Sequence, residues 1–171
     1  MRTVLPAVAA LLLMAAPARA EVVASAANGF EVRHTAVVET TPAQAWRTLG
    51  QIGRWWNDAH TYSGRAANMR MDLRAGGCWC ETWADGSVEH GRVVYAQRNQ
   101  TLRLASNAGP LQEMGLNGIL TYSIAPEGDG VRLTMHYRVN GNGLTDLTQI
   151  APVVDQVLGE QFASLTALAA R

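Results

Sequence analysis

A run of hairpins that ends in one long apolar helix is the feature that most constrains this chain. Alternating apolar and polar residues predict the strands, and Gly, Asn and Asp residues mark the turns between them. The predicted strands are 30–39, 69–73, 78–83, 88–97, 101–106, 119–125 and 131–139. Apolar residues, Phe162 among them, then recur at helical spacing from about residue 146 to residue 169. A curved antiparallel sheet closed by one such helix leaves a cavity between the two.

The segment after the first strand carries the signals of a short helix. Thr41 is a good N-cap, Pro42 suits the first helical position, and Gln44 stands where a capping-box partner belongs. Gly50 and Gly53 then interrupt the helix, and residues 52–56 predict a second short helical turn. We therefore expect two short helices between the first strand and the next.

The N-terminus reads as an export signal. An apolar run at residues 4–16 precedes Pro17 and the small-x-small sequence Ala18-Arg19-Ala20, which predicts cleavage after Ala20. The run is shorter than the roughly 18 to 20 residues that a membrane-spanning helix needs, so we expect no membrane span after cleavage. Residues 21–29 are expected to form a flexible lead-in and residues 30–171 a single domain, located in the periplasm or outside the cell.

The charged residues exclude several classes of function. Cleavage would remove Arg2 and Arg19, which leaves 12 basic residues against 14 acidic ones and little attraction for nucleic acid. The chain contains no lysine. Chemistry that needs a lysine amine, such as a Schiff base or a phosphate-binding P-loop, is therefore excluded.

Several of these patterns together resemble a known superfamily. They are residues 40–46 after the first strand, the pair Trp55-Trp56, residues 72–77, residues 91–94 and the terminal helix. The chain resembles the START-like, or SRPBCC, superfamily, and within it the homologues of the heat-shock-protein ATPase activator, which are grouped with polyketide cyclase and dehydrase proteins. The resemblance implies an α+β helix-grip fold, in which a curved antiparallel sheet of six to seven strands wraps around the long C-terminal helix.

The resemblance also implies a use for the cavity. Elsewhere in the superfamily the space between sheet and helix holds lipids, sterols, plant hormones or polyketides. An export signal departs from the cytosolic cochaperone members, because the periplasm holds neither their chaperone partner nor ATP.

One pair of residues suggests acid–base chemistry. If Asp85-Gly86 is a two-residue hairpin turn, Glu81 faces His90 and Trp79 faces Arg92 across the strands. Such a pair can move protons, because the carboxylate orients the imidazole. The alternative is a solvated ion pair that contributes under about 1 kcal/mol to stability.

The preceding turn decides which face this pair occupies. A two-residue turn at Ala75-Gly76 places Glu81 and His90 toward water. Adding Gly77 to the turn places residues 79, 81 and 83 beside Leu73 and the methionines of the preceding strand. The superfamily turns an aromatic residue inward after Gly-Gly, and this favours the second arrangement.

Further candidates for ligand contact are one histidine and several aromatic residues. His34 interrupts the apolar face of the first strand, where it is either a core histidine or a polar contact for a ligand. The aromatic rings can stack on a flat ligand or simply fill the core. The candidates for ligand contact are His34, Trp55, Trp56, Trp79, Trp83 and Phe162.

The two cysteines of the chain lie two residues apart. On a regular strand Cys78 and Cys80 are about 6.6 Å apart, near the upper edge of disulfide geometry. We favour two buried thiols over a disulfide. A thiolate metal site that includes His90 fails, because Cys80 and His90 point to opposite faces of the hairpin. HExxH and CxxC spacings are absent, and so is a GxSxG elbow, so we predict no metal, no cofactor and no serine nucleophile.

These observations lead to three hypotheses for the function. The first is an exported protein that binds a hydrophobic or aromatic small molecule in the cavity. The second is a cyclase-like or aromatase-like enzyme in which Glu81 and His90 move protons at a bound carbonyl compound. The third is a protein-binding module that resembles the cochaperone branch.

Overall fold

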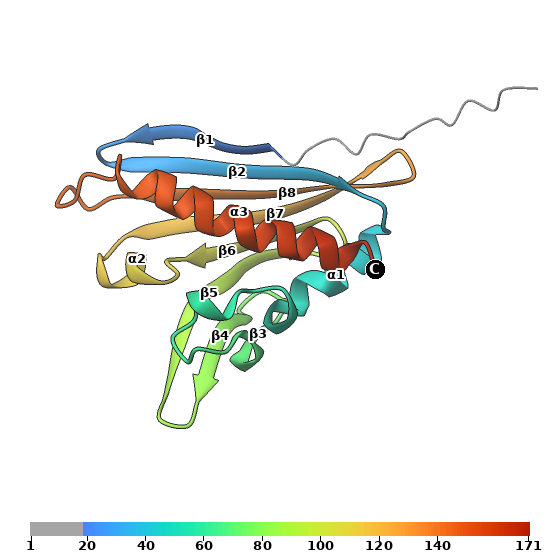
Figure 1. Cartoon of the computed structure of the whole chain (residues 1–171), viewed down its shortest axis with the longest axis horizontal. Helices are drawn as coiled ribbons and strands as arrows, with labels where there is room; N and C mark the ends of the chain where they lie inside the picture. Colours follow the sequence, from blue (N-terminus) through green and yellow to red (C-terminus); the bar gives the residue numbers. More distant parts are fainter. Residues whose placement is uncertain (1–18) are drawn as a thin grey trace, which may run out of the picture.

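A computed structural model of the chain describes residues 19–171 (Figure 1). Most of the predicted export signal lies outside the described residues, so export remains a prediction. Within residues 19–171 no helix has the length and apolarity needed to cross a membrane.

One antiparallel sheet of eight strands forms most of the molecule. Its strands are β1 (Arg19–Ala26), β2 (Gly29–Val38), β3 (Met69–Met71), β4 (Cys78–Trp83), β5 (Gly86–Gln97), β6 (Thr101–Ser106), β7 (Asn117–Glu127) and β8 (Gly130–Asn140). Their order across the sheet is β1-β2-β8-β7-β6-β5-β4-β3. The last six strands therefore form a meander, and β2 closes it against β8.

The eighth strand is the one that the sequence did not predict. Residues 21–29, expected to be a flexible lead-in, instead belong mostly to β1, which pairs with β2 at Val22 and Val32. Pairing satisfies backbone groups that would otherwise form an open sheet edge, and Val22 packs against the core. The small residues of this segment thus form a strand through tertiary contacts.

The connection after β2 begins with α1 (Pro42–Gly50). The predicted N-cap is confirmed, because Thr41 Oγ1 accepts a hydrogen bond from the backbone N–H of Gln44 at 3.1 Å. The side chain of Gln44 accepts from Arg47. Short 3₁₀ turns η1 (Ile52–Arg54), η2 (Asp58–His60) and η3 (Ala66–Asn68) then lead to β3.

The C-terminal helix α3 (Ile150–Ala169) crosses one face of the sheet, with α1 near its C-terminal end and the short α2 (Pro110–Glu113) near its N-terminal end (Figure 1). It begins later than residue 146. Pro152 lies in the first turn of α3, where a backbone N–H would have no partner within the helix. Pro152 therefore marks the start of the helix rather than a kink. Phe162 and Leu165 are buried against the sheet.

Hairpin geometry places Glu81 and His90 on the inner face of the sheet. Met69 pairs with Glu81 and Met71 pairs with Trp79, so the side chains of Trp79 and Glu81 point inward. The strand β3 ends at Met71 rather than at Leu73. The inward arrangement is therefore the one that forms.

The turn between β4 and β5 differs from the prediction. Trp83 pairs with Gly86, so the turn residues are 84–85 rather than 85–86. As a result Glu81 lies opposite Val88, and Trp79 lies opposite Gly91 rather than Arg92. The pairing shifts by one residue between Gly91 and Glu89, and His90 is the extra residue of this β-bulge. The bulge turns the His90 side chain to the same face as Glu81.

Candidate functional site

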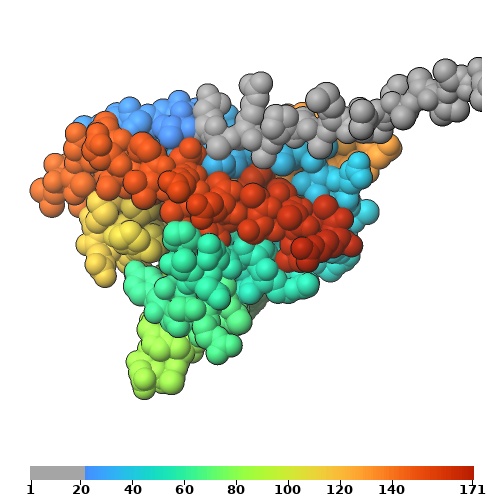
Figure 2. Space-filling view, in the orientation of Figure 1, coloured from blue at the N-terminus to red at the C-terminus, as the bar shows by residue number. Residues whose placement is uncertain are grey.

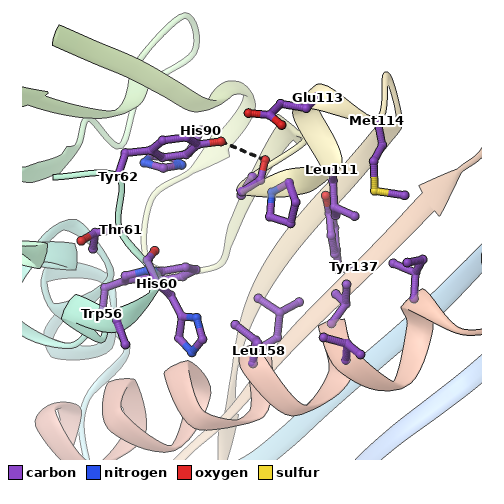
Figure 3. A pocket seen from close by; sticks show the side chains of 18 residues that line it. Trp56, His60, Thr61, Tyr62, His90, Leu111, Glu113, Met114, Tyr137 and Leu158 are labelled. Carbon is purple, nitrogen blue, oxygen red and sulfur yellow. Dashed lines mark hydrogen bonds between the residues drawn. The ribbon is translucent and has the colours of Figure 1, made fainter. Parts of the chain in front are cut away.

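An apolar pocket of about 680 Å³ opens beside the N-terminal half of α3. This volume is within the usual range for small-molecule sites. Three segments enclose it, as Figure 3 shows: residues 56–62 after α1, residues 108–114 around α2, and α3 itself. The lining residues are Trp56, Ala59, His60, Thr61, Tyr62, His90, Ala108, Gly109, Pro110, Leu111, Glu113, Met114, Tyr137, Ile150, Val153, Val154, Val157 and Leu158.

The pocket occupies only one end of the space between sheet and helix. In the C-terminal half of α3, Phe162 and Leu165 are almost fully buried and close that end. In the space-filling view the yellow segment around α2 and the teal segment after α1 both border α3 on the same side of the molecule (Figure 2). The expected cavity is therefore present, but it is bounded by two loops as well as by sheet and helix.

Glu81 and His90 form a buried pair at the wall of this pocket. His90 Nε2 lies 3.0 Å from Glu81 Oε2, and the two side chains are 3% and 0% exposed. The Glu81 carboxylate also accepts hydrogen bonds from the backbone N–H groups of Tyr62, at 3.1 Å, and of Ser63. Three donors therefore converge on one buried carboxylate.

The surroundings of the pair set its charge state. Burial raises the pKa of Glu81, but the hydrogen bonds from Ser63, Tyr62 and His90 together lower it below its ordinary value. Burial lowers the pKa of His90, and the neighbouring carboxylate offsets only part of that effect. At neutral pH the pair is therefore an ionised Glu81 beside a neutral His90.

Two aromatic rings pack against the imidazole of His90. The ring of Trp79 lies 5.1 Å away between centroids and that of Tyr62 lies 5.9 Å away. Tyr62 Oη donates to the carbonyl of Gly109 at 3.2 Å, drawn as the dashed line in Figure 3. The backbone is held too, since Ser106 Oγ donates to the His90 carbonyl at 2.8 Å. The imidazole therefore has a fixed position and orientation.

The aromatic candidates from the sequence fall into two groups. Trp56 lines the pocket, and its Nε1 donates to the carbonyl of His60 at 2.9 Å. Trp55, Trp79 and Phe162 are core residues outside the pocket lining. Trp83 is half-buried at the end of the β4–β5 hairpin, where its ring covers Gly86. Of the predicted tryptophans, only Trp56 contacts the pocket.

His34 lies under α3 and does not line the pocket. Its Nε2 is 3.0 Å from Asp155 Oδ1, although the two atoms are not aligned as a hydrogen bond. Burial lowers the pKa of His34, and Asp155 opposes that shift. The ring packs against Phe162 and against Gly159, where an added Cβ would lie 3.1 Å from His34 Cε1. The space left by the missing side chain of Gly159 is therefore occupied by the ring of His34.

The loop residues of the pocket are those that sequence reasoning missed. Thr61 and Tyr62 lie between the predicted helical turn at 52–56 and the predicted strand 69–73, and Leu111 and Met114 lie between the predicted strands 101–106 and 119–125. Neither stretch has strand or helix periodicity. The one local signal was Gly109-Pro110, which is typical of a helix start and does begin α2.

Cys78 and Cys80 are joined in a disulfide. The prediction of two buried thiols is therefore wrong. Their Cα atoms are 5.4 Å apart, closer than on a regular strand. The register of β4 against β5 shifts between Trp79 and Cys80. Both side chains are half-buried on the outer face of the sheet, with the Glu89 carboxylate nearby. In the disulfide form the sulfurs are not thiolate ligands for a metal.

Comparison with known proteins gives similarity in structure alone. No known family profile matches the sequence, and no curated protein matches it significantly. A protein from Mesorhizobium loti is 18% identical with a TM-score of 0.58, over 81% of this chain and 95% of that one. A protein from Rhodobacter sphaeroides is 19% identical with a TM-score of 0.56, over 89% and 98%.

A third similar structure is the Aha1 dimer from Colwellia psychrerythraea, 12% identical with a TM-score of 0.54, over 80% of this chain and 92% of that one. At these identities the comparisons show the fold alone. They support the helix-grip arrangement that the sequence resemblance implied.

Proposed function

We propose that this protein is an exported binding protein for a hydrophobic or aromatic small molecule. The observation that carries the proposal is the pocket of about 680 Å³ beside α3. Its walls are mostly aliphatic and aromatic, as in sites that bury most of a ligand's surface.

The layout of the pocket supports reversible binding. Two of its three walls are connecting segments with only one short helical turn each, residues 56–62 and 108–114, whereas the third is a long helix anchored at its far end by Phe162 and Leu165. Loops can move apart at lower cost than packed helices and sheets. A ligand can therefore enter between the loops while the core stays intact.

Native mass spectrometry of the mature protein tests this proposal. We expect a copurifying small molecule whose removal lowers the melting temperature. Val154→Trp should fill the pocket and abolish binding, because Val154 is a half-buried lining residue. Val37→Trp, at an exposed position of β2, is the matched control and should bind as the wild type does. Wild-type protein that is always empty and binds no apolar probe would refute the proposal.

The buried Glu81–His90 pair favours a second candidate, an enzyme that moves a proton at a bound carbonyl compound. A neutral imidazole oriented by a carboxylate is a suitable general base. Mass spectrometry of the bound molecule from wild type and from His90→Asn distinguishes the two functions. A binding protein carries the same molecule in both, whereas an enzyme accumulates unreacted substrate in the variant.

A further inference from the structure

Four polar side chains of the pocket wall use their donor hydrogens within the protein. Tyr137 Oη donates to the Ser106 carbonyl at 2.8 Å, and Thr61 Oγ1 donates to the Asp58 carbonyl at 2.7 Å. Tyr62 Oη and Trp56 Nε1 also donate to backbone carbonyls, as described above. These four side chains therefore have no donor hydrogen left for a ligand.

Among the buried lining residues His90 is the exception, whereas His60 and Glu113 are more exposed. Its Nε2 is hydrogen-bonded to Glu81, but its Nδ1 has no hydrogen-bond partner within residues 22–171. Nδ1 is also not among the fully buried unpaired atoms of that region, so it keeps some exposed surface. His90 lines the pocket although it is only 3% exposed. It thus contributes one small polar spot to an apolar wall.

The hydrogen-bond pattern at Glu81 determines which nitrogen of His90 carries the proton. The carboxylate accepts from two backbone N–H groups and from the imidazole, so it has no proton to give. Nε2 must then be the N–H donor, and in a neutral imidazole Nδ1 is an acceptor. A ligand that meets this atom has to supply the hydrogen.

The charges of the lining limit the ligand further. Among the described residues that line the pocket none is an arginine, and the chain has no lysine. The carboxylate of Glu113 is at the exposed rim, and His60 Nε2 is 3.7 Å from Glu160. An anionic ligand such as a fatty acid would therefore enter an apolar site without a counter-ion, at high cost in desolvation.

We propose that the pocket selects a neutral apolar molecule that carries a hydroxyl group and donates its hydrogen to Nδ1 of His90. This inference rests on the proposed function, since it names the class of ligand for the same pocket. It assigns Glu81 the role of a positioning residue that fixes the orientation and tautomer of His90.

Three naphthalene probes of similar size test the proposal: 2-naphthol, 2-methoxynaphthalene and 2-naphthoate. Binding to protein stripped of endogenous ligand is measured by calorimetry at pH 7. We expect 2-naphthol to bind about fivefold to tenfold more tightly than the methoxy compound, the worth of one neutral hydrogen bond. 2-Naphthoate should bind more weakly than both.

Two histidine variants assign the preference to its atom. His90→Phe should abolish the difference between 2-naphthol and 2-methoxynaphthalene. His136→Phe is the matched control, because His136 is likewise 3.0 Å from a carboxylate, that of Glu31, but lies on the outer face of the sheet. It should keep the preference. Nitrogen-15 spectra of the wild-type imidazoles give a readout that needs no variant, and we expect a bare Nδ1 on His90.

Each contrary result identifies which step fails. Equal affinity for naphthol and its methyl ether, or a protonated Nδ1 at pH 7, overturns the hydroxyl inference and leaves the binding function standing. Tightest binding of naphthoate overturns the neutrality of the ligand. Failure of all three probes to bind overturns the inference, and together with a wild-type protein that is always empty it refutes the proposed function as well.

Discussion

His90 Nε2 lies 3.0 Å from Glu81 Oε2 although the two residues are not directly opposite each other in the β4–β5 ladder. The bulge at His90 brings the side chains together on the inner face. The contact therefore depends on an irregularity of one strand, and it holds the Glu81 carboxylate, which does not line the pocket, beside the lining residue His90.

Glu81→Ala should destabilise the protein by about 3 kcal/mol, because it leaves His90 and two backbone N–H groups without their acceptor. Urea denaturation followed by fluorescence measures the loss. Glu31→Ala is a suitable control, since Glu31 contacts His136 and Arg138 in a partly exposed site on the outer face. Its loss should be under about 1 kcal/mol. Equal losses in the two variants would contradict the account of Glu81.

Acid should destabilise the protein as the pH falls below the ordinary pKa of histidine, 6.5. Burial lowers the pKa of folded His90, so the unfolded chain binds a proton in this range before the folded one does. The lowered pKa of Glu81 acts in the same direction below its ordinary value of 4.5. Stability is thus fully present above pH 6.5 and lost as the pH falls.

Urea titrations between pH 7.5 and pH 5 check this sign. Each proton that the unfolded chain binds and the folded chain does not changes the stability by roughly 1.4 kcal/mol per pH unit. His90→Phe removes one such group and should have a shallower slope than the wild type. A wild-type stability that rises with acid would contradict the buried neutral state of His90.

Gly159→Ala should have opposite effects in two backgrounds. In the wild type the new Cβ lies 3.1 Å from His34 Cε1 and 3.5 Å from Nδ1, so the ring must move and stability falls by about 1 kcal/mol or more. In a His34→Ala background the ring is absent, and alanine should stabilise the helix by up to about 1 kcal/mol. A double-mutant cycle in urea measures the difference. Additive effects would show that His34 and Gly159 do not interact.

Removal of the disulfide should have a small effect. Cys78 and Cys80 are two residues apart, so their bond closes a very short loop and restricts the unfolded chain little. We expect Cys78→Ala with Cys80→Ala to cost at most about 2 kcal/mol and to leave ligand affinity unchanged, since neither residue lines the pocket. Thermal melts and calorimetry with 2-naphthol measure the two quantities. A large loss of affinity would link the outer face of β4 to the pocket.

Only part of the candidate site was visible in the sequence. The sequence predicted Glu81 and His90 as partners. It also favoured the inward arrangement of these residues over the outward one. The turn used for that prediction was displaced by one residue, however, and the bulge restored the contact. A bulge of this kind has no simple sequence signal, because it depends on how β5 pairs with both β4 and β6.

Trp55 and Trp56 show how little residue type alone says about a site. The two are adjacent in the sequence and both are nearly buried, yet only Trp56 lines the pocket. Trp55 instead donates to the carbonyl of Thr48 at 3.0 Å within the core. Large apolar rings suit a core and a ligand site equally well, so their direction had to come from the fold.

The sequence by itself determined the order of the hairpins, the N-cap at Thr41 and the apolar stripe of α3, because strand alternation, capping and helical periodicity depend on residues close together in the chain. Tertiary structure decided that residues 21–26 join the sheet, that His34 lies under α3, and that the pocket opens between residues 56–62 and 108–114. These outcomes depend on contacts between segments far apart in the sequence, and local patterns carry no information about such contacts.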